Sequence, residues 1–110
     1  MHKFSIIFVF ALAAFFAQTT PSHACDFEVI IKDHRFSPAE IHIPANEEIT
    51  LNVHNQDATP EEFESHDLKR EKVIPANSKA KIKIGPLKPG TYGFFGEFNQ
   101  KTAQGKIIAE

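Results

Sequence analysis

The feature that most restricts the fold of this chain is a series of short runs in which apolar and polar residues alternate. The clearest run covers residues 49–54, where Ile49, Leu51 and Val53 are separated by polar residues. Because successive side chains of a β-strand point to opposite faces, this period of two predicts a strand with one buried and one solvated face. We expect further strands at 27–32, 40–43, 79–84, 91–95 and 105–109.

Turn-forming residues separate these runs at intervals of about ten residues. Pro44-Ala45-Asn46 ends one run, and residues 85–90 place two glycines and two prolines between two others. Short strands at this spacing are typical of an all-β sandwich or barrel with antiparallel strands. The polar side of the 79–84 run consists of lysines, which we interpret as a solvated face, with a docking patch for an acidic partner as the alternative.

Residues 59–74 interrupt the strand pattern. Thr59-Pro60-Glu61-Glu62 has the pattern of a capping box with proline at the first helical position. Phe63 and Leu68 are the only large apolar residues before Val73, too few for the apolar face of an amphipathic helix. We therefore expect one short helical turn at most, followed by an extended segment.

Residues 1–24 have the layout of a secretory signal peptide. A lysine at position 3 precedes the apolar run Phe4–Ala17, and Ser22 and Ala24 provide the small residues of a cleavage site. The apolar run is shorter than the roughly 20 apolar residues that a membrane-spanning helix needs. We expect a signal peptide at 1–24, a folded domain at 25–110 and export to the periplasm.

Cys25 would be the first residue of the exported protein. A cysteine at that position raises lipid attachment as an alternative to an incidental exposed thiol, although the leucine usual three places upstream is missing. Because it is the only cysteine, no internal disulfide can form.

The composition of residues 25–110 excludes some functional classes. These 86 residues suffice for one domain, and their 11 basic and 14 acidic side chains give a net charge of −3. Such a surface argues against nucleic-acid binding, which depends on clustered lysine and arginine. No nucleophile–base pair or phosphate loop is recognisable, so we assign no catalytic residue. His42 and His54 occupy outward positions and are expected to be solvated.

The order of several motifs resembles that of a cupredoxin. The matching segments are 36–44, 49–55, 59–63, 87–95 and 105–108, which together cover almost all of the expected domain. The resemblance implies a small antiparallel Greek-key β-sandwich. It also implies a place for copper, held in most cupredoxins by two histidines, a cysteine and a methionine.

Matching residue by residue removes all four copper ligands. Glu61 stands at the first histidine, Gly96 at the cysteine, Asn99 at the second histidine and Ala103 near the methionine. A blue-copper site requires a soft thiolate with two imidazoles. We therefore expect no type 1 copper centre.

A narrower resemblance concerns segments 62–65, 70–72, 84–87, 94–98 and 102–105. These are similar to the cupredoxin-like periplasmic proteins associated with high-affinity iron permeases. The resemblance implies a role in ferrous iron uptake, alongside a membrane iron permease and a separate periplasmic metal-binding protein. Enzymatic oxidation of ferrous iron would need an electron acceptor, so enzyme activity is left open and is not the favoured interpretation.

Acidic residues in these segments are the candidate metal ligands. Glu62 and Glu64 lie two apart in an extended segment and share a face, and Glu97 comes from a loop expected at the same end of the sandwich. His66 is close in sequence. Carboxylates with one imidazole suit iron or copper(II) better than copper(I).

The alternative is an internal ion-pair network without metal. Arg70 or Lys72 would then neutralise Glu64 and Glu97, because a guanidinium can bond a carboxylate through two parallel hydrogen bonds. In that case the protein would be a metal-free structural or interaction module. A third hypothesis, an electron-transfer protein with an unusual copper site, is disfavoured by the missing thiolate.

Overall fold

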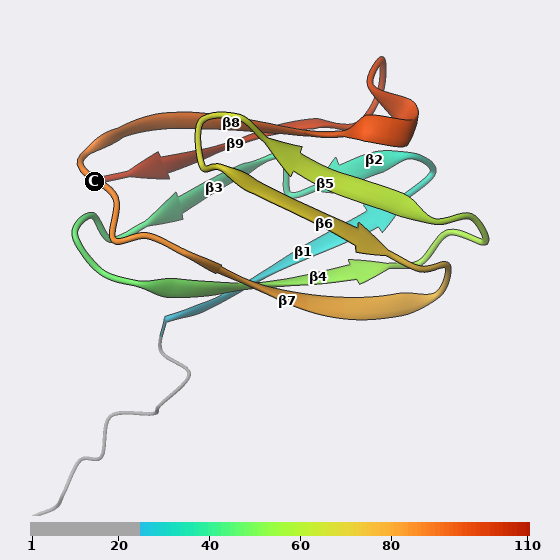
Figure 1. Ribbon diagram of the computed structural model, residues 1–110, viewed down its shortest axis with the longest axis horizontal. Coiled ribbons are helices and arrows are strands. Elements are labelled where there is room, and N and C mark those ends of the chain that lie inside the picture. Colours follow the sequence, from blue (N-terminus) through green and yellow to red (C-terminus); the bar gives the residue numbers. More distant parts are fainter. Residues whose placement is uncertain (1–24) are drawn as a thin grey trace, which may run out of the picture.

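The computed structural model describes residues 25–110, so the expected signal peptide lies outside the described residues. The described chain forms nine strands and one short 3-10 helix (Figure 1). No helix in residues 25–110 is long and apolar enough to cross a membrane. The strands are β1 (Asp26–Lys32), β2 (Arg35–Ser37), β3 (Glu40–Ile43), β4 (Ile49–Asn55), β5 (Glu61–Ser65), β6 (Arg70–Ile74), β7 (Ser78–Ile84), β8 (Gly90–Gly96) and β9 (Gln104–Ala109). The 3-10 helix η1 spans Glu97–Asn99.

These strands form two sheets that pack as a sandwich, which confirms the all-β prediction. One sheet has the order β2-β1-β4-β7 and the other the order β3-β9-β8-β5-β6. Two pairs, β1 with β4 and β3 with β9, are parallel, whereas the remaining pairs are antiparallel. The sheets are therefore mixed, and the expected antiparallel pairing holds for all pairs except these two. The chain crosses from one sheet to the other between β2 and β3. The two strands of each parallel pair are therefore joined by a crossover between the sheets rather than by a hairpin.

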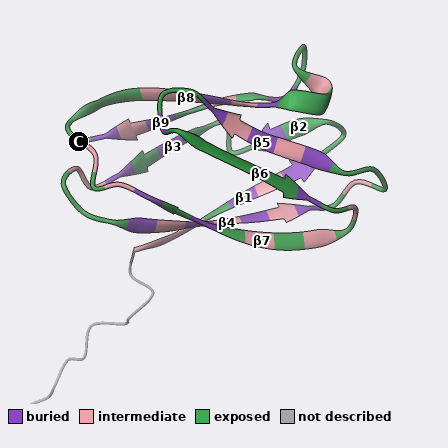
Figure 2. Ribbon diagram, in the orientation of Figure 1, coloured by how far each residue is buried: buried purple, intermediate pink, exposed green. Residues whose placement is uncertain are grey.

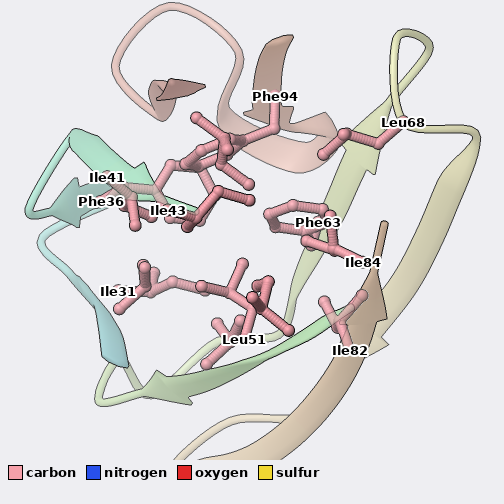
Figure 3. Close-up of a cluster of buried hydrophobic side chains, with 14 of the residues drawn as sticks. Ile31, Phe36, Ile41, Ile43, Leu51, Phe63, Leu68, Ile82, Ile84 and Phe94 are labelled. Atoms are coloured by element: carbon pink, nitrogen blue, oxygen red, sulfur yellow. The ribbon is translucent and has the colours of Figure 1, made fainter. Parts of the chain in front are cut away.

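The core lies between the sheets and is built by the alternation seen in the sequence. Along β4 every second residue is buried, and the residues between them are only partly covered (Figure 2). Three rings from β2, β5 and β8, those of Phe36, Phe63 and Phe94, form its aromatic centre (Figure 3). Their centroids lie 4.9 to 6.2 Å apart. Burying each such side chain contributes about 1.5–3 kcal/mol, so this cluster fixes how the sheets pack.

The expected helical turn at 59–62 is absent, because Glu61 begins strand β5. Phe63 and Glu61 both face inward along β5, and the strand pairs with β6 and β8. Asn55 holds the preceding loop: its Nδ2 donates to the carbonyl oxygens of Thr59 at 2.9 Å and Ile74 at 3.1 Å. The Thr59 carbonyl is bonded to Asn55 and alternate side chains of residues 61–65 are buried. Residues 61–65 therefore form a strand, although the local sequence has the pattern of a helix start.

Candidate functional site

The four positions that match the copper ligands converge at one end of the sandwich, around the carboxylate of Glu61. This side chain comes from the start of β5 and is only 1% exposed. Its Oε2 accepts a hydrogen bond from Asn99 Nδ2 at 2.7 Å. Its Oε1 accepts hydrogen bonds from the backbone N–H groups of Phe98 at 2.8 Å and Glu62 at 2.9 Å. Three donors therefore satisfy this buried carboxylate without a metal ion.

Gly96 is required by the packing around Glu61. A Cβ atom at this position would lie 2.6 Å from Glu61 Cδ and Oε2 and 2.7 Å from the Cβ of Ala103. The backbone N–H of Gly96 donates to the carbonyl of Ala103 at 2.9 Å, and that of Ala103 donates to Asn99 at 2.8 Å. The Glu61 centre, meaning Glu61, Gly96, Asn99 and Ala103, contains no thiolate, imidazole or thioether. Its donor set does not fit type 1 copper.

A second set of carboxylates lies on the outer face of the same strand. Glu62 and Glu64 alternate with the inward Glu61 and Phe63, and Glu71 stands opposite Glu64 on β6. Each of the three offers a carboxylate oxygen, and these atoms all lie within 4.8 Å of one another. We call Glu62, Glu64 and Glu71 the acidic cluster.

The carboxylates of the acidic cluster repel one another, although Lys69 and Arg70 line the same hollow as Glu64 and Glu71. Partial burial, followed by the negative charge of Glu71, raises the pKa of Glu62 above its ordinary value of 4.5. The pKa of Glu64 is raised by the same causes, with a further contribution from Glu97 and an opposing one from His66. None of the ion pairs between residues 25 and 110 includes a member of the cluster. Carboxylates in this arrangement favour the approach of a cation.

The structure brings the predicted site residues together in part. Glu62 and Glu64 form the cluster as their spacing predicted, and the charge of Glu97, at the start of η1, acts on both. His66 lies in the turn after β5 with its ring centroid 5.5 Å from that of Phe95. Neither Glu97 nor His66 belongs to the group of three close carboxylates. Whether these residues bind metal stays a prediction.

Sequence reasoning missed Glu71 as a member of the site. Its place depends on the register of the hairpin, in which Glu64 pairs with Glu71 and Glu62 with Val73. A turn centred between Ser65 and Arg70 would have given that register. The signal was present in the sequence, but the segment 66–74 was interpreted only as extended chain.

Neither Arg70 nor Lys72, the cations of the alternative ion-pair network, forms an ion pair with Glu64 or Glu97 among residues 25–110. Arg70 instead donates from Nε to the carbonyl of Lys83 at 2.8 Å and from Nη1 to that of Lys69 at 3.1 Å. Strand alternation is the reason, because residues 70 and 72 lie on the opposite side of β6 from Glu71. Arg70 thus ties the edge of one sheet to β7 of the other.

His42 is held by two carboxylates, away from His54. Its Nδ1 lies 2.7 Å from Glu110 Oε2 and its Nε2 lies 2.8 Å from Glu40 Oε2. The two carboxylates, Glu110 first, raise the pKa of His42 above 6.5. His54 is on β4 in the other sheet, and the side chain of His42 is half exposed, in line with its outward position.

This fold and the convergence of the matched positions at Glu61 define the class of the protein, and a family comparison agrees. The chain belongs to the cupredoxin-like domain family, whose model matches residues 5–109. An uncharacterized protein of Rickettsia prowazekii (strain Madrid E), RP394, is 47% identical over 89 residues, which are 81% of this chain and 71% of that protein.

Solved structures share the fold at low sequence identity. Auracyanin A, a blue copper protein of Chloroflexus aurantiacus, is 14% identical with a TM-score of 0.68 over 77% of this chain and 98% of its own. Amicyanin from Paracoccus versutus is 20% identical with a TM-score of 0.62 over 79% and 83%. The metal-binding domain of the Cu(I)-exporting ATPase CopA of Streptococcus pneumoniae D39, solved with Cu(I), is 14% identical with a TM-score of 0.69 over 77% and 84%. These similarities show the fold.

Proposed function

We propose that this protein is an exported accessory protein of ferrous iron uptake, which binds a divalent metal ion at the acidic cluster and passes it on. The observation that carries the proposal is the close approach of the carboxylates of Glu62, Glu64 and Glu71. Their mutual repulsion disfavours the ionised, metal-free state, and a divalent cation would relieve it. Glu97 adds charge nearby, and His66 offers an imidazole at the edge of the site.

The carboxylates of the acidic cluster support binding of iron rather than a type 1 copper centre. Carboxylate oxygens are hard ligands that suit iron, manganese or copper(II), whereas copper(I) prefers thiolate and thioether. In the Glu61 centre, hydrogen bonds replace the soft ligands. A cupredoxin-like domain with a carboxylate site on its outer face therefore fits binding of Fe(II) on the surface.

Delivery to a membrane iron permease, together with a separate periplasmic metal-binding protein, is the role that the motif resemblance supports. Binding and transfer need only the carboxylates. Oxidation of Fe(II) would need an electron acceptor, so we propose transfer rather than catalysis. Export by the segment at 1–24 is part of the same proposal.

Anaerobic calorimetric titration of the protein with Fe(II), Mn(II) and Cu(II) tests the proposal. We expect saturable binding of one ion, weakened roughly tenfold or more by Glu71→Gln, which removes one ligand of the cluster. Glu48→Gln is the matched control, because Glu48 is exposed and lies outside the cluster. Binding that is absent, or equally weak in both variants, would contradict the proposal.

A metal-free interaction module is the second candidate, and the Glu61 centre favours it. The three hydrogen bonds to Glu61 hold the loop after β8 in place without an ion. This candidate predicts no saturable binding of any of the three metals. An intense blue absorption with copper would instead support an electron-transfer protein.

A further inference from the structure

Two large apolar side chains are exposed in the described residues, and both lie beside the start of β5. Val73 is 50% exposed and Phe98 is 51% exposed. Val73 stands opposite Glu62 in the β5–β6 pairing, and the backbone N–H of Phe98 donates to Glu61 at 2.8 Å. The two apolar residues therefore meet the same short segment from two sides.

Four carboxylates that form no ion pair among residues 25–110 also lie on or beside this segment. The acidic cluster lies on β5 and β6, and Glu97 precedes Phe98 in η1. We define the β5–β6 face as the surface formed by Val73, Phe98, Glu97 and the acidic cluster. Figure 2 shows β6 exposed along most of its length, in contrast to β5 beside it. Exposed apolar anchors next to charged groups are the composition of a protein-binding surface.

Charge decides what kind of partner this face fits. Its four carboxylates have no ion-pair partner among residues 25–110, and one divalent ion in the cluster would still leave a net charge of −2. Anionic lipid surfaces and nucleic acids are repelled by such a face. A two-fold contact with a second copy would set the same carboxylates against each other.

We propose that the β5–β6 face is the docking surface for a protein partner that presents arginine or lysine side chains around an apolar recess. Phe98 and Val73 enter the recess, and the basic groups meet Glu62, Glu64, Glu71 and Glu97. The assignment of this partner as donor or recipient of the metal ion rests on the proposed function. The docking surface itself rests on exposure and charge.

The test uses a defined probe, a blocked five-residue peptide of alternating arginine and leucine. It is titrated into the 15N-labelled protein at low ionic strength and followed by amide chemical shifts. We expect the shifts to centre on Glu62, Val73 and Phe98. Phe98→Ser and Val73→Ser should each weaken binding roughly fivefold to tenfold. Lys79→Ser, on the exposed side of β7 in the other sheet, is the matched control and should leave the affinity unchanged.

Further measurements separate the apolar contribution to peptide binding from membrane binding and from metal binding. Replacing leucine by serine in the peptide should weaken binding as the protein variants do, and Phe98→Tyr should keep it. Unchanged affinity in both serine variants, shifts spread over the whole surface, or sedimentation with phosphatidylglycerol vesicles would overturn the proposal. Peptide binding without saturable Mn(II) binding would remove the metal role and leave the docking surface. Metal binding without peptide binding would remove the docking surface alone.

Discussion

Glu61 and Glu62 are neighbours in β5 and carry the same carboxylate, yet they lie in opposite surroundings. Glu61 points into the sandwich, where three donors within 2.9 Å satisfy it. Glu62 points outward, where its carboxylate lies within 4.8 Å of those of Glu64 and Glu71. The inner carboxylate is fully compensated, so it contributes to structure. The outer one is left to be compensated by something else, and the candidate function therefore lies on the surface of the sheet rather than in its interior.

Removing the inner carboxylate should have the largest effect. Glu61→Ala leaves two backbone N–H groups and the Asn99 amide without their acceptor, and we expect it to lower the free energy of unfolding by about 3 kcal/mol. Glu62→Ala should keep or raise stability, because it removes a repelled charge. Urea unfolding of the two variants measures the contrast. Equal losses would show that the two carboxylates are not as different as their contacts indicate.

Filling the space beside Glu61 should have the next largest effect. Gly96→Ala forces a Cβ against the Glu61 carboxylate and Ala103, and we expect a loss of about 1–3 kcal/mol. Gly93→Ala is the matched control in the same strand, because its Cβ would meet only Asp67 Oδ2 at 3.8 Å. Thermal unfolding distinguishes them. A double variant with Glu61→Ala should lose less than the sum of the single losses, since the two sites share one contact.

Metal binding at the acidic cluster should stabilise the folded protein. Free Fe(II) or Mn(II) at about 100 times Kd would stabilise the folded protein by about 2.7 kcal/mol. The measurement is the anaerobic melting temperature with and without Mn(II), and Glu64→Gln should reduce the shift. A shift of the same size in Glu64→Gln would place the ion elsewhere.

The pH dependence of the outer carboxylates follows from their raised pKa values. A carboxyl group whose folded pKa lies above its ordinary 4.5 holds its proton more tightly in the folded state. Stability of the metal-free protein should therefore be gained as pH falls through the raised values and lost again as it rises. Glu71→Gln should remove part of this dependence for Glu62 and Glu64. Melting temperatures between about pH 4 and pH 7 test it.

The smallest effect is expected at His42, because its side chain is half exposed. Its pKa is raised, so its contribution is fully present below the ordinary value of 6.5 and is lost as pH rises through the folded value. His42→Gln should abolish this step in a plot of stability against pH. The step should also shrink at high salt, since exposed pairs are screened. A step that persists in the variant would belong to another group.

The sequence predicted the parts of the structure that depend on local periodicity. Alternation at Ile49, Leu51 and Val53 gave a strand buried on one side, and the spacing of Glu62 and Glu64 gave two outward carboxylates on one face. The lack of copper ligands at the four matched positions could also be seen in the sequence, because whether a side chain can bind copper depends on its residue type. The convergence of Glu61 and Asn99 then gave this absence a structural explanation.

Features that depend on pairing between distant segments were not accessible in the same way. The parallel pairing of β1 with β4 and β3 with β9 follows from crossovers between sheets, which local periodicity does not encode. Glu61 was assigned to the start of a helical turn from its neighbours in sequence. Its inward position could not be predicted in this way, because the donors that bind it come from Phe98 and Asn99. Arg70 was assigned to carboxylates by charge, whereas alternation directs it to the carbonyl of Lys83.

The close approach of Gly96 to Glu61 also restricts how such a chain can change over generations. A cysteine at 96 would bring its Cβ against the carboxylate, and loss of Glu61 first would leave buried donors unpaired. Either single step passes through a less stable protein, and marginally stable proteins tolerate few such losses. A lineage descending from this sequence would have to exchange both residues nearly together before position 96 could hold a thiolate. The glycine thus makes a blue-copper site difficult to build from this sequence by single substitutions.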